Sequence, residues 1–334
     1  MVDRQNALNY ERSGEWLSLS ANALASRAAL AGVQQIEAGS HPHHVRQWLL
    51  ALGLFPERYI NRLFSVGGIQ MDGKTIRLRT FIPADPAKDA VYRMAMQQRE
   101  VAAGSKQLPS LSQANVLYQD DWCLVMDKPA GMPVHPNAPG QRGTLDEAAA
   151  LAGIERGEHQ LAKHIHRLDD DTSGPVLYAR NELAQLRLDE AMREKTIGRQ
   201  YVALVQGVLR KAKGTIDAPI SKDRHHSARR RVTPAGSGDH AVTHYEVIAS
   251  YRRATLVRLW LETGRTHQIR VHMSHLGHPL VGDTLYGGSD AKLRHQALRG
   301  EQLTFVHPWS FDTMTVHADE PSWFQEVRER YALL

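Results

Sequence analysis

The chain has 334 residues, 42% of them hydrophobic, and a formal net charge of +5 at pH 7. This length is enough for a full hydrophobic core and favours about two domains. No apolar run approaches the ~20 residues of a membrane-spanning helix, and the first residues lack the pattern of a signal peptide. The single cysteine, Cys123, excludes an internal disulfide, which is typical of a reducing compartment. We therefore expect a cytoplasmic protein without membrane contact, and its mild basic excess suits a polyanionic partner.

The N-terminal region starts with a weak pattern and then becomes regular. Residues 1–43 are polar and Ala-rich, so we expect a variable segment with one short strand at EWLSL. Residues 44–67 carry apolar residues at helical spacing and predict two helices, which end at Gly53 and Gly67. The letters IQM, the turn pair Asp72-Gly73 and KTIRLRTF then predict a β-hairpin.

Basic residues decorate this helix–helix–hairpin pattern. Four of them are candidates for contacts with RNA: Arg46, Arg58, Arg62 and Lys74. The arrangement resembles the alpha-L motif, an RNA-binding module named after a small-subunit ribosomal protein. We expect residues 44–83 to form such a domain and to contribute affinity rather than chemistry. A small α/β cap with ordinary surface charge is the alternative.

The rest of the chain is dominated by strand patterns. Residues 84–114 lack a strong period and predict a linker with some helix. Residues 182–195 contain no Gly, Pro or β-branched residue and predict a helix. Strands are expected at NVLYQ, CLVMDK, YVALVQGVL, THYEVIAS and TLVRLWLE. Residues 115–325 are therefore expected to form an α+β domain whose largely antiparallel sheet is flanked by helices.

A second concentration of positive charge lies between residues 210 and 231. Eight Lys or Arg residues stand there against two Asp residues. The segment is a candidate for phosphate contacts, in which we expect Arg229 and Arg230 to take part. A solvated, flexible loop is the alternative.

The letters HRLDDDTSG, residues 166–174, place three consecutive carboxylates ahead of an apolar strand. A calcium-binding loop would use Asp169, Asp171 and Ser173. Its seventh position is Pro175, however, and its twelfth is Arg180, where a bidentate Glu is needed. Two histidine patterns, at residues 164–169 and 272–278, lack the further ligands of a zinc site. We therefore expect no metal and regard a metal-dependent hydrolase as the weaker alternative.

A single one of these acids is the other chemical possibility. A carboxylate nucleophile works best when it is ionised, shielded from water and held by a cation. The letters GRTHQIRVHMSHLG, residues 264–277, supply a cation on a helix that we expect Thr266 to cap. Arg270 would lie beside the buried stripe of that helix, at the edge of the core. The expected stripe consists of Ile269, His272, Met273 and Leu276.

Five motifs occur in order across residues 115–320. They are VMDKPAGMPVHP, HRLDDDTSG, RQYVALVQG, GRTHQIRVH and GHPLVGDTLYGG. Together they resemble the successive motifs of the RluA-type pseudouridine synthases, and several motifs in register are far more specific than one. The resemblance implies the pseudouridine synthase fold, with Asp169 as the catalytic aspartate. It also implies that Tyr201 stacks on the target base and is a proposed proton acceptor, and that Arg270 pairs with the aspartate. Asp170 and Asp171 fall at variable positions of the family.

The resemblance further implies a function: the isomerisation of specific uridines in structured RNA to pseudouridine. The reaction involves no redox change and no hydrolysis, so we expect no cofactor. We expect RNA as the partner of a monomeric enzyme. Four residues within the same motifs are expected to bind the substrate: Arg167, Thr172, Arg265 and His267.

Large-subunit ribosomal RNA is the expected target because the alpha-L-like unit suits a folded RNA, and transfer RNA is the alternative. A different class of function, a catalytically silent RNA-binding or ribosome-assembly factor, would be favoured if the catalytic positions were missing, and all three are present. If residues 44–83 serve affinity alone, a chain that starts near residue 112 should still fold.

Overall fold

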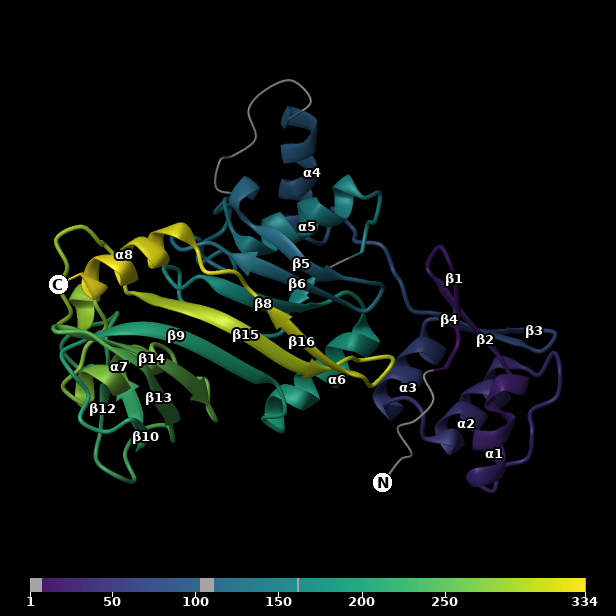
Figure 1. Ribbon diagram of the computed structural model, residues 1–334. Coiled ribbons are helices and arrows are strands. Elements are labelled where there is room, and N and C mark those ends of the chain that lie inside the picture. The colour runs from purple at the N-terminus through teal and green to yellow at the C-terminus, as the bar shows by residue number, and fades with distance from the viewer. Residues whose placement is uncertain (1–7, 103–110, 161, 334) are drawn as a thin grey trace.

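The computed structural model describes residues 8–102, 111–160 and 162–333. Figure 1 shows a small N-terminal unit beside a larger body that contains two antiparallel sheets. The mixed fold with mainly antiparallel sheets and flanking helices confirms the expected fold class. None of the described helices is long and apolar enough to cross a membrane.

The N-terminal unit combines a four-stranded sheet with three helices. The sheet has the order β1-β2-β4-β3, formed by β1 (Glu11–Ser13), β2 (Trp16–Ser20), β3 (Ile69–Asp72) and β4 (Thr75–Arg79). The helices are α1 (Ala25–Leu30), α2 (Pro42–Leu52) and α3 (Glu57–Ser65). The two helices and the hairpin predicted after residue 44 are confirmed, and Gly53 ends α2 with φ 61°.

This unit begins earlier than the boundary at residue 44 that we expected from the sequence. Strand β2 pairs with β4, so that Leu17 lies opposite Leu78 and Leu19 opposite Ile76. All four side chains are at most 2% exposed. Residues 11–20 therefore belong to the same sheet, because without β2 one edge of β4 and the core beneath it would face water.

The larger body is built from two sheets. The first has the order β5-β6-β8-β7, with β5 (Asn115–Gln119), β6 (Cys123–Lys128), β7 (Lys163–His164) and β8 (Gly174–Ala179). The second has the order β10-β13-β14-β9-β15-β16, with β9 (Gly198–Gln206), β10 (Lys213–Asp217), β13 (Val242–Ser250), β14 (Ala254–Leu261), β15 (Leu298–Val306) and β16 (Thr313–His317). A separate hairpin pairs β11 (Ile220–Lys222) with β12 (Arg230–Val232).

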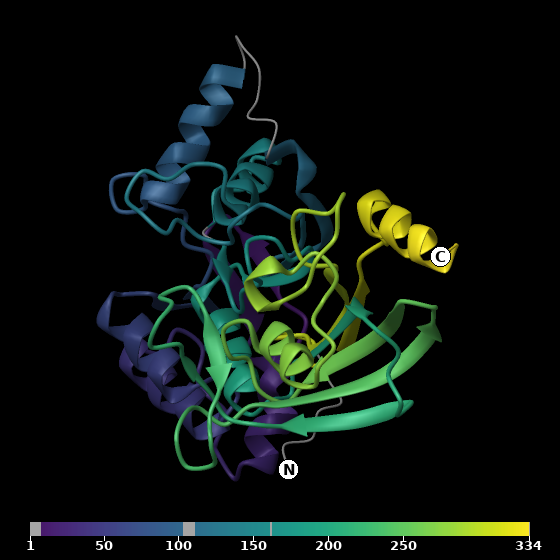
Figure 2. The same ribbon diagram turned by 90° about the vertical axis from the view of Figure 1, so that its left-hand side faces the viewer.

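Helices cover both faces of the six-stranded sheet. Helix α7 (Gln268–His275) covers one face and α8 (Ser322–Ala332) covers the other. The other helices of the body pack elsewhere; they are α4 (Ala90–Ala102), α5 (Leu145–Glu155) and α6 (Glu182–Arg193). In Figure 2, α7 lies against the long green strands of this sheet, and it contacts β12 and β13. Alternate residues of β9 face opposite sides: Tyr201 and Ala203 share a core with Ile269 of α7, whereas Val202 and Leu204 pack with α8.

The two sheets of the body meet at a contact between glycines. The Gly300 amide donates a 2.7 Å hydrogen bond to the Ser173 carbonyl, and a Cβ atom on Gly174 would lie 2.6 Å from the Gly300 Cα. Gly174 also has φ +127°, a conformation that other residues rarely adopt. The last letter of HRLDDDTSG is therefore required by backbone packing, and this contact holds the acidic loop against β15.

The N-terminal unit and the body share one hydrophobic core. The Trp122 ring, which is 1% exposed, stacks on Trp309 with centroids 4.4 Å apart, and Tyr10 and Phe81 from the N-terminal side pack on Trp122 edge to face. In Figure 1, α3 and α6 lie side by side, and Arg62 of α3 forms an ion pair with Glu182 of α6. The unit is thus attached by packing as well as by the chain.

Candidate active site

The acidic loop between β7 and β8 is held in place by a buried lysine. Lys128 is fully buried, and its ammonium donates hydrogen bonds to the carbonyls of Met132 (2.5 Å), Asp170 (2.6 Å) and Pro129 (3.0 Å). The Asp170 carbonyl also accepts from the Gly131 amide at 3.0 Å. The letters DKPAG and HRLDDD, which begin 39 residues apart, therefore build one structure that fixes the backbone of the acidic loop at Asp170.

Asp169 faces an arginine that is itself held by a second carboxylate. Arg270 Nη1 lies 3.3 Å from Asp169 Oδ2, while Nε and Nη2 donate to the two oxygens of Asp283 at 2.7 and 2.8 Å. Burial alone would lower the pKa of Arg270, but the hydrogen bonds and charges of Asp283 and Asp169 raise it above its ordinary value. The arginine is therefore a fixed cation whose free edge points at Asp169.

Helix α7 brings Arg270 to this position, although it begins differently from the expectation. It starts at Gln268, preceded by His267 in the left-handed conformation (φ 58°), so the prediction of a Thr266 cap is wrong. The Gln268 amide orders the turn instead: its oxygen accepts from Thr263 Oγ1 and the Arg265 amide, and its nitrogen donates to the Val242 carbonyl. Leu276 is 40% exposed and is not part of the buried stripe.

The expected site residues line one pocket with a volume of about 100 Å³. All seven take part: Asp169, Tyr201, Arg270, Arg167, Thr172, Arg265 and His267. Tyr201 projects from the middle of β9 and is 6% exposed, and this burial raises the pKa of its hydroxyl. Arg167 and Arg265 are exposed. The pocket thus offers a carboxylate, a neutral phenol and an aromatic face within reach of several guanidinium groups.

His267 is placed by a chain of hydrogen bonds. Its Nε2 lies 3.9 Å from Asp169 Oδ2, and its Nδ1 lies 2.8 Å from the hydroxyl of Tyr286. That hydroxyl also accepts the amide of Arg230 from β12 at 2.9 Å. Burial lowers the pKa of His267 and favours the neutral imidazole. Donation by the tyrosine hydroxyl to Nδ1 would leave the proton of this imidazole on Nε2, on the side of Asp169.

Sequence reasoning did not assign roles to Asp283, Lys128, Tyr286 and Arg199. Asp283 and Tyr286 occur in the motif GHPLVGDTLYGG, and Lys128 in VMDKPAG, so the motifs themselves were the available signal. Arg199 lines the pocket from β9, two residues before Tyr201. Because residues two apart on a strand face the same side of the sheet, the assignment of Tyr201 to the pocket indicates that the side chain of Arg199 faces it as well.

The six predicted RNA-binding residues lie outside this pocket. Arg46 donates to Asn61, Arg62 pairs with Glu182, and Arg229 pairs with Asp223. Arg58 is exposed on α3, and Lys74 is exposed at the β3–β4 turn. Arg230 is the first residue of β12. Of these residues, Arg58 and Arg62 line a second cavity, between α3 and α6. The basic segment at 210–231 contains β10, β11 and β12 and is therefore not simply a loop.

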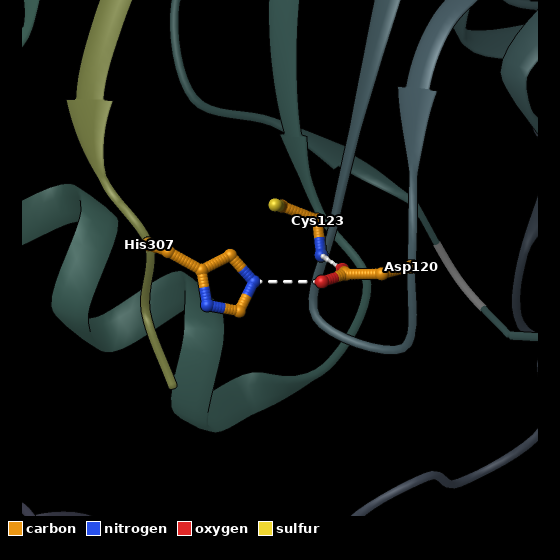
Figure 3. Close-up of side chains that lie close together, drawn as sticks. All are labelled: Asp120, Cys123 and His307. Atoms are coloured by element: carbon orange, nitrogen blue, oxygen red, sulfur yellow. Dashed lines mark hydrogen bonds and ion pairs between the residues drawn. The ribbon is translucent and has the colours of Figure 1, made fainter. Parts of the chain in front are cut away.

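One group of side chains in the described part of the chain resembles a metal site, and it lies away from the acidic loop: Asp120, Cys123 and His307 (Figure 3). Asp120 accepts from the amides of Trp122 and Cys123 and from His307 Nε2 at 2.7 Å. His307 Nδ1 accepts from the Ser310 amide, so both ring nitrogens are engaged. Burial raises the pKa of the Cys123 thiol. These hydrogen bonds join the β5–β6 turn to the end of β15 and leave no free ligand set.

Comparison with known proteins agrees with this geometry. A family model described as RNA pseudouridylate synthase matches residues 122–275. Two solved structures share the fold: Human RNA Pseudouridylate Synthase Domain Containing 1 (24% identity, TM-score 0.53, covering 65% of this chain and 87% of that one) and Domain Containing 4 (22%, 0.56, 72% and 97%).

Similar sequences extend over most of the chain. The Bacillus subtilis protein named uncharacterized RNA pseudouridine synthase YhcT is 44% identical over 229 residues, which cover 68% of this chain and 75% of the relative. Ribosomal large subunit pseudouridine synthase D of Xanthomonas campestris pv. campestris is 39% identical over 291 residues, covering 82% and 85%. The chain therefore belongs to the RNA pseudouridylate synthases of the RluA type and is an RNA-modifying isomerase.

Proposed function

We propose that the protein converts specific uridines of large-subunit ribosomal RNA to pseudouridine, with Asp169 as the nucleophile. One observation carries the catalytic assignment: Asp169 shares a pocket with Tyr201 and lies 3.3 Å from the fixed guanidinium of Arg270. The choice of RNA is supported by the similarity to ribosomal large subunit pseudouridine synthase D from several bacteria. Transfer RNA is the main alternative.

The proposed chemistry needs only groups that this pocket contains. The bond between the ribose and N1 of uracil breaks, the base turns, a new bond forms through C5, and C5 loses a proton. Asp169 supplies the electron pair that starts the exchange, and Arg270 offers its carboxylate a counter-charge. Tyr201 offers a face on which the flipped base stacks and a hydroxyl beside it. The atoms balance without oxidant, reductant or water, so no cofactor is required.

We assign the other parts of the chain to RNA binding. Residues 44–83, together with the strands before them, form the alpha-L-like unit, and residues 84–114 link it to a catalytic domain at 115–325. Phosphate contacts are assigned to the six basic residues named above. Arg58, Lys74 and Arg230 suit this role because they are not held by a carboxylate within the described residues, whereas Arg62 and Arg229 are.

The catalytic assignment is tested by exchanging each acid of the loop for its amide. Asp169→Asn removes the charge but keeps the shape, so pseudouridine formation should fall at least a thousandfold while RNA binding survives. Asp170→Asn and Asp171→Asn are matched controls and should stay within about tenfold of wild type. Tritium release from RNA labelled at C5 of uridine measures the rate. Asp169→Asn activity within tenfold of wild type would remove the assignment.

The RNA target is tested in cells. Pseudouridine mapping of total RNA with and without the gene should reveal a lost site in large-subunit ribosomal RNA, and expression of the wild-type protein should restore it. Loss of a transfer-RNA pseudouridine with unchanged ribosomal RNA would show that the proposed target is wrong. The Asp169→Asn variant should fail to restore the site.

A further inference from the structure

Arg199 is an arginine in the active-site pocket for which the reaction described above has no use. It precedes Tyr201 by two residues on β9 and lines the same pocket. Gln200 between them faces the other side and donates to Glu301 Oε2 at 2.9 Å. The alternation of β9 therefore directs the guanidinium of Arg199 towards the place where the target nucleotide must sit.

Among the residues that the structure describes, none pairs with the charge of Arg199. Its Nε atom is shielded from water and has no hydrogen-bond partner, and across the described parts of the chain the guanidinium makes no ion pair. The other guanidinium groups of the pocket are engaged: Arg270 by Asp283 and Asp169, Arg265 by the His240 carbonyl, and Arg167 by His135. A partly buried cation without a partner is costly, and a site of this kind is stabilised when an anion enters it.

The neighbouring backbone leaves room for this side chain. A Cβ atom built on Gly264 would lie 2.9 Å from Arg199 Nη1 and 3.4 Å from Nη2, and it would meet no other group that close. Gly264 does not have a positive φ, so its backbone conformation does not require glycine. The absent side chain at Gly264 therefore has a steric consequence: it lets the guanidinium occupy the wall of the pocket.

We infer that Arg199 binds a phosphodiester of the RNA adjacent to the target uridine and holds the flipped nucleotide over Asp169. The inference rests on RNA being the substrate, and it adds a binding residue to the proposed site. A phosphate fits the donor set because the planar guanidinium presents parallel N–H groups to two oxygens of one anion. Pocket walls that carry more arginine than carboxylate further favour an anionic group.

The decisive experiment neutralises the contact from both sides. A synthetic RNA carrying the mapped uridine is made with a neutral methylphosphonate at each linkage flanking that uridine in turn, and kcat/KM is measured for wild type and Arg199→Gln. At one linkage the neutral RNA should cost wild type about tenfold or more, as expected for a charge-assisted hydrogen bond, and cost Arg199→Gln little. Full additivity at every linkage would overturn the inference.

Two further variants separate binding from folding. Gly264→Ala keeps the positive charge but displaces the guanidinium, so it should lower kcat/KM in the wild-type background and have little further effect with Arg199→Gln. Equal losses in both backgrounds would contradict the inference. Arg193→Gln removes an exposed charge from the end of α6 and serves as the control. Because wild type must first modify the unsubstituted RNA, failure of the proposed function is recognised separately from failure of this contact.

A salt titration gives an independent readout. Loss of one phosphate contact should reduce the slope of log affinity against log salt by about one unit. Arg199→Gln should show this change while its thermal unfolding midpoint stays near that of wild type. An unchanged slope together with a lowered midpoint would assign Arg199 a structural role and overturn the inference.

Discussion

Arg270 holds Asp283 with two nitrogens and Asp169 with the third. The Asp283 bonds are 2.7 and 2.8 Å long and the Asp169 contact is 3.3 Å. Asp283 is 2% exposed, so this pair is buried, whereas the side chain of Asp169 remains 22% exposed at the pocket. Asp283 therefore sets the position of Arg270, and the positive charge of Arg270 acts on Asp169.

Asp283→Asn is expected to impair catalysis through Arg270, although the side chain at position 283 does not itself touch the target base. The amide offers one acceptor oxygen instead of two, so Arg270 loses a charge-assisted bond and turns away from Asp169. We expect kcat to fall about ten- to a hundredfold, with KM little changed, because one such bond is worth roughly 1.5–3 kcal/mol. Asp290→Asn, which breaks an ion pair with Arg330 away from the pocket, is the matched control. Wild-type kcat in Asp283→Asn would contradict this positioning role.

Tyr201→Phe is expected to separate stacking from proton transfer. The phenyl ring keeps the face that receives the base, so RNA affinity should stay within about threefold of wild type. Turnover should fall at least a hundredfold if the hydroxyl takes part in removing the proton from C5. Filter binding and tritium release measure the two quantities. Unchanged turnover would leave Tyr201 with stacking alone.

Lys128 predicts a dependence of activity on alkaline pH. Burial lowers the pKa of Lys128 to about 8. Above that pH the amine has two N–H groups for three carbonyls, so the acidic loop loosens and kcat should decline. The folded pKa lies below the ordinary value, so the unfolded chain binds more protons between about pH 8 and 10.5, and the contribution of this group to stability rises there. Activity should therefore fall between about pH 8 and 10.5, a range in which the titration of Lys128 does not promote unfolding.

A substitution tests the same residue. Lys128→Met removes all three hydrogen bonds, so turnover at neutral pH should drop at least tenfold and the decline near pH 8 should disappear. Lys88→Met, which changes a lysine side chain that is 86% exposed, is the control and should keep the wild-type profile. An identical alkaline decline in Lys128→Met would assign the titration to another group.

Truncation of the N-terminal unit is expected to damage the catalytic body. A chain that starts at residue 112 would expose Trp122 and Trp309, which are 1% and 6% exposed in the full protein. Each buried aromatic side chain contributes roughly 1.5–3 kcal/mol. The shared core thus argues against the separable unit expected from the sequence. Thermal unfolding followed by tryptophan fluorescence, with dye binding to exposed apolar surface, measures the effect. A truncated chain with a cooperative transition near that of the full protein would contradict this prediction.

The elements that follow local rules were predictable from the sequence. The helices at 42–65, the β3–β4 hairpin and the helix at 182–193 have clear periods, turn residues or helix formers, and the structure contains them. The short strand expected at EWLSL is present as β2, but β1 was not expected, and the pairing of β2 with β4, about 60 residues later, could not be read from local pattern. The start of α7 was missed because the Gln268 side chain, rather than a Thr266 cap, satisfies the turn.

The candidate site divides in a similar way. The motifs identified the residues that gather in the pocket, since each carries a recognisable chemical group. They did not reveal that Arg270 uses two of its nitrogens on Asp283, or that Arg199 Nε has no hydrogen-bond partner within the described residues. Such relations depend on distances between loops that are far apart in the chain, and local spacing does not encode them.

The stacked tryptophans that join the two parts of the molecule also bear on the distance between the N-terminal unit and the active site. Because Trp122 and Trp309 lie in a core shared with the N-terminal unit, packing as well as the linking chain places that unit relative to Asp169. An RNA that is gripped at both places must carry its uridine at a matching separation. The enzyme would then select a uridine by its distance from a second contact point in the folded RNA, rather than by the nucleotide sequence around it.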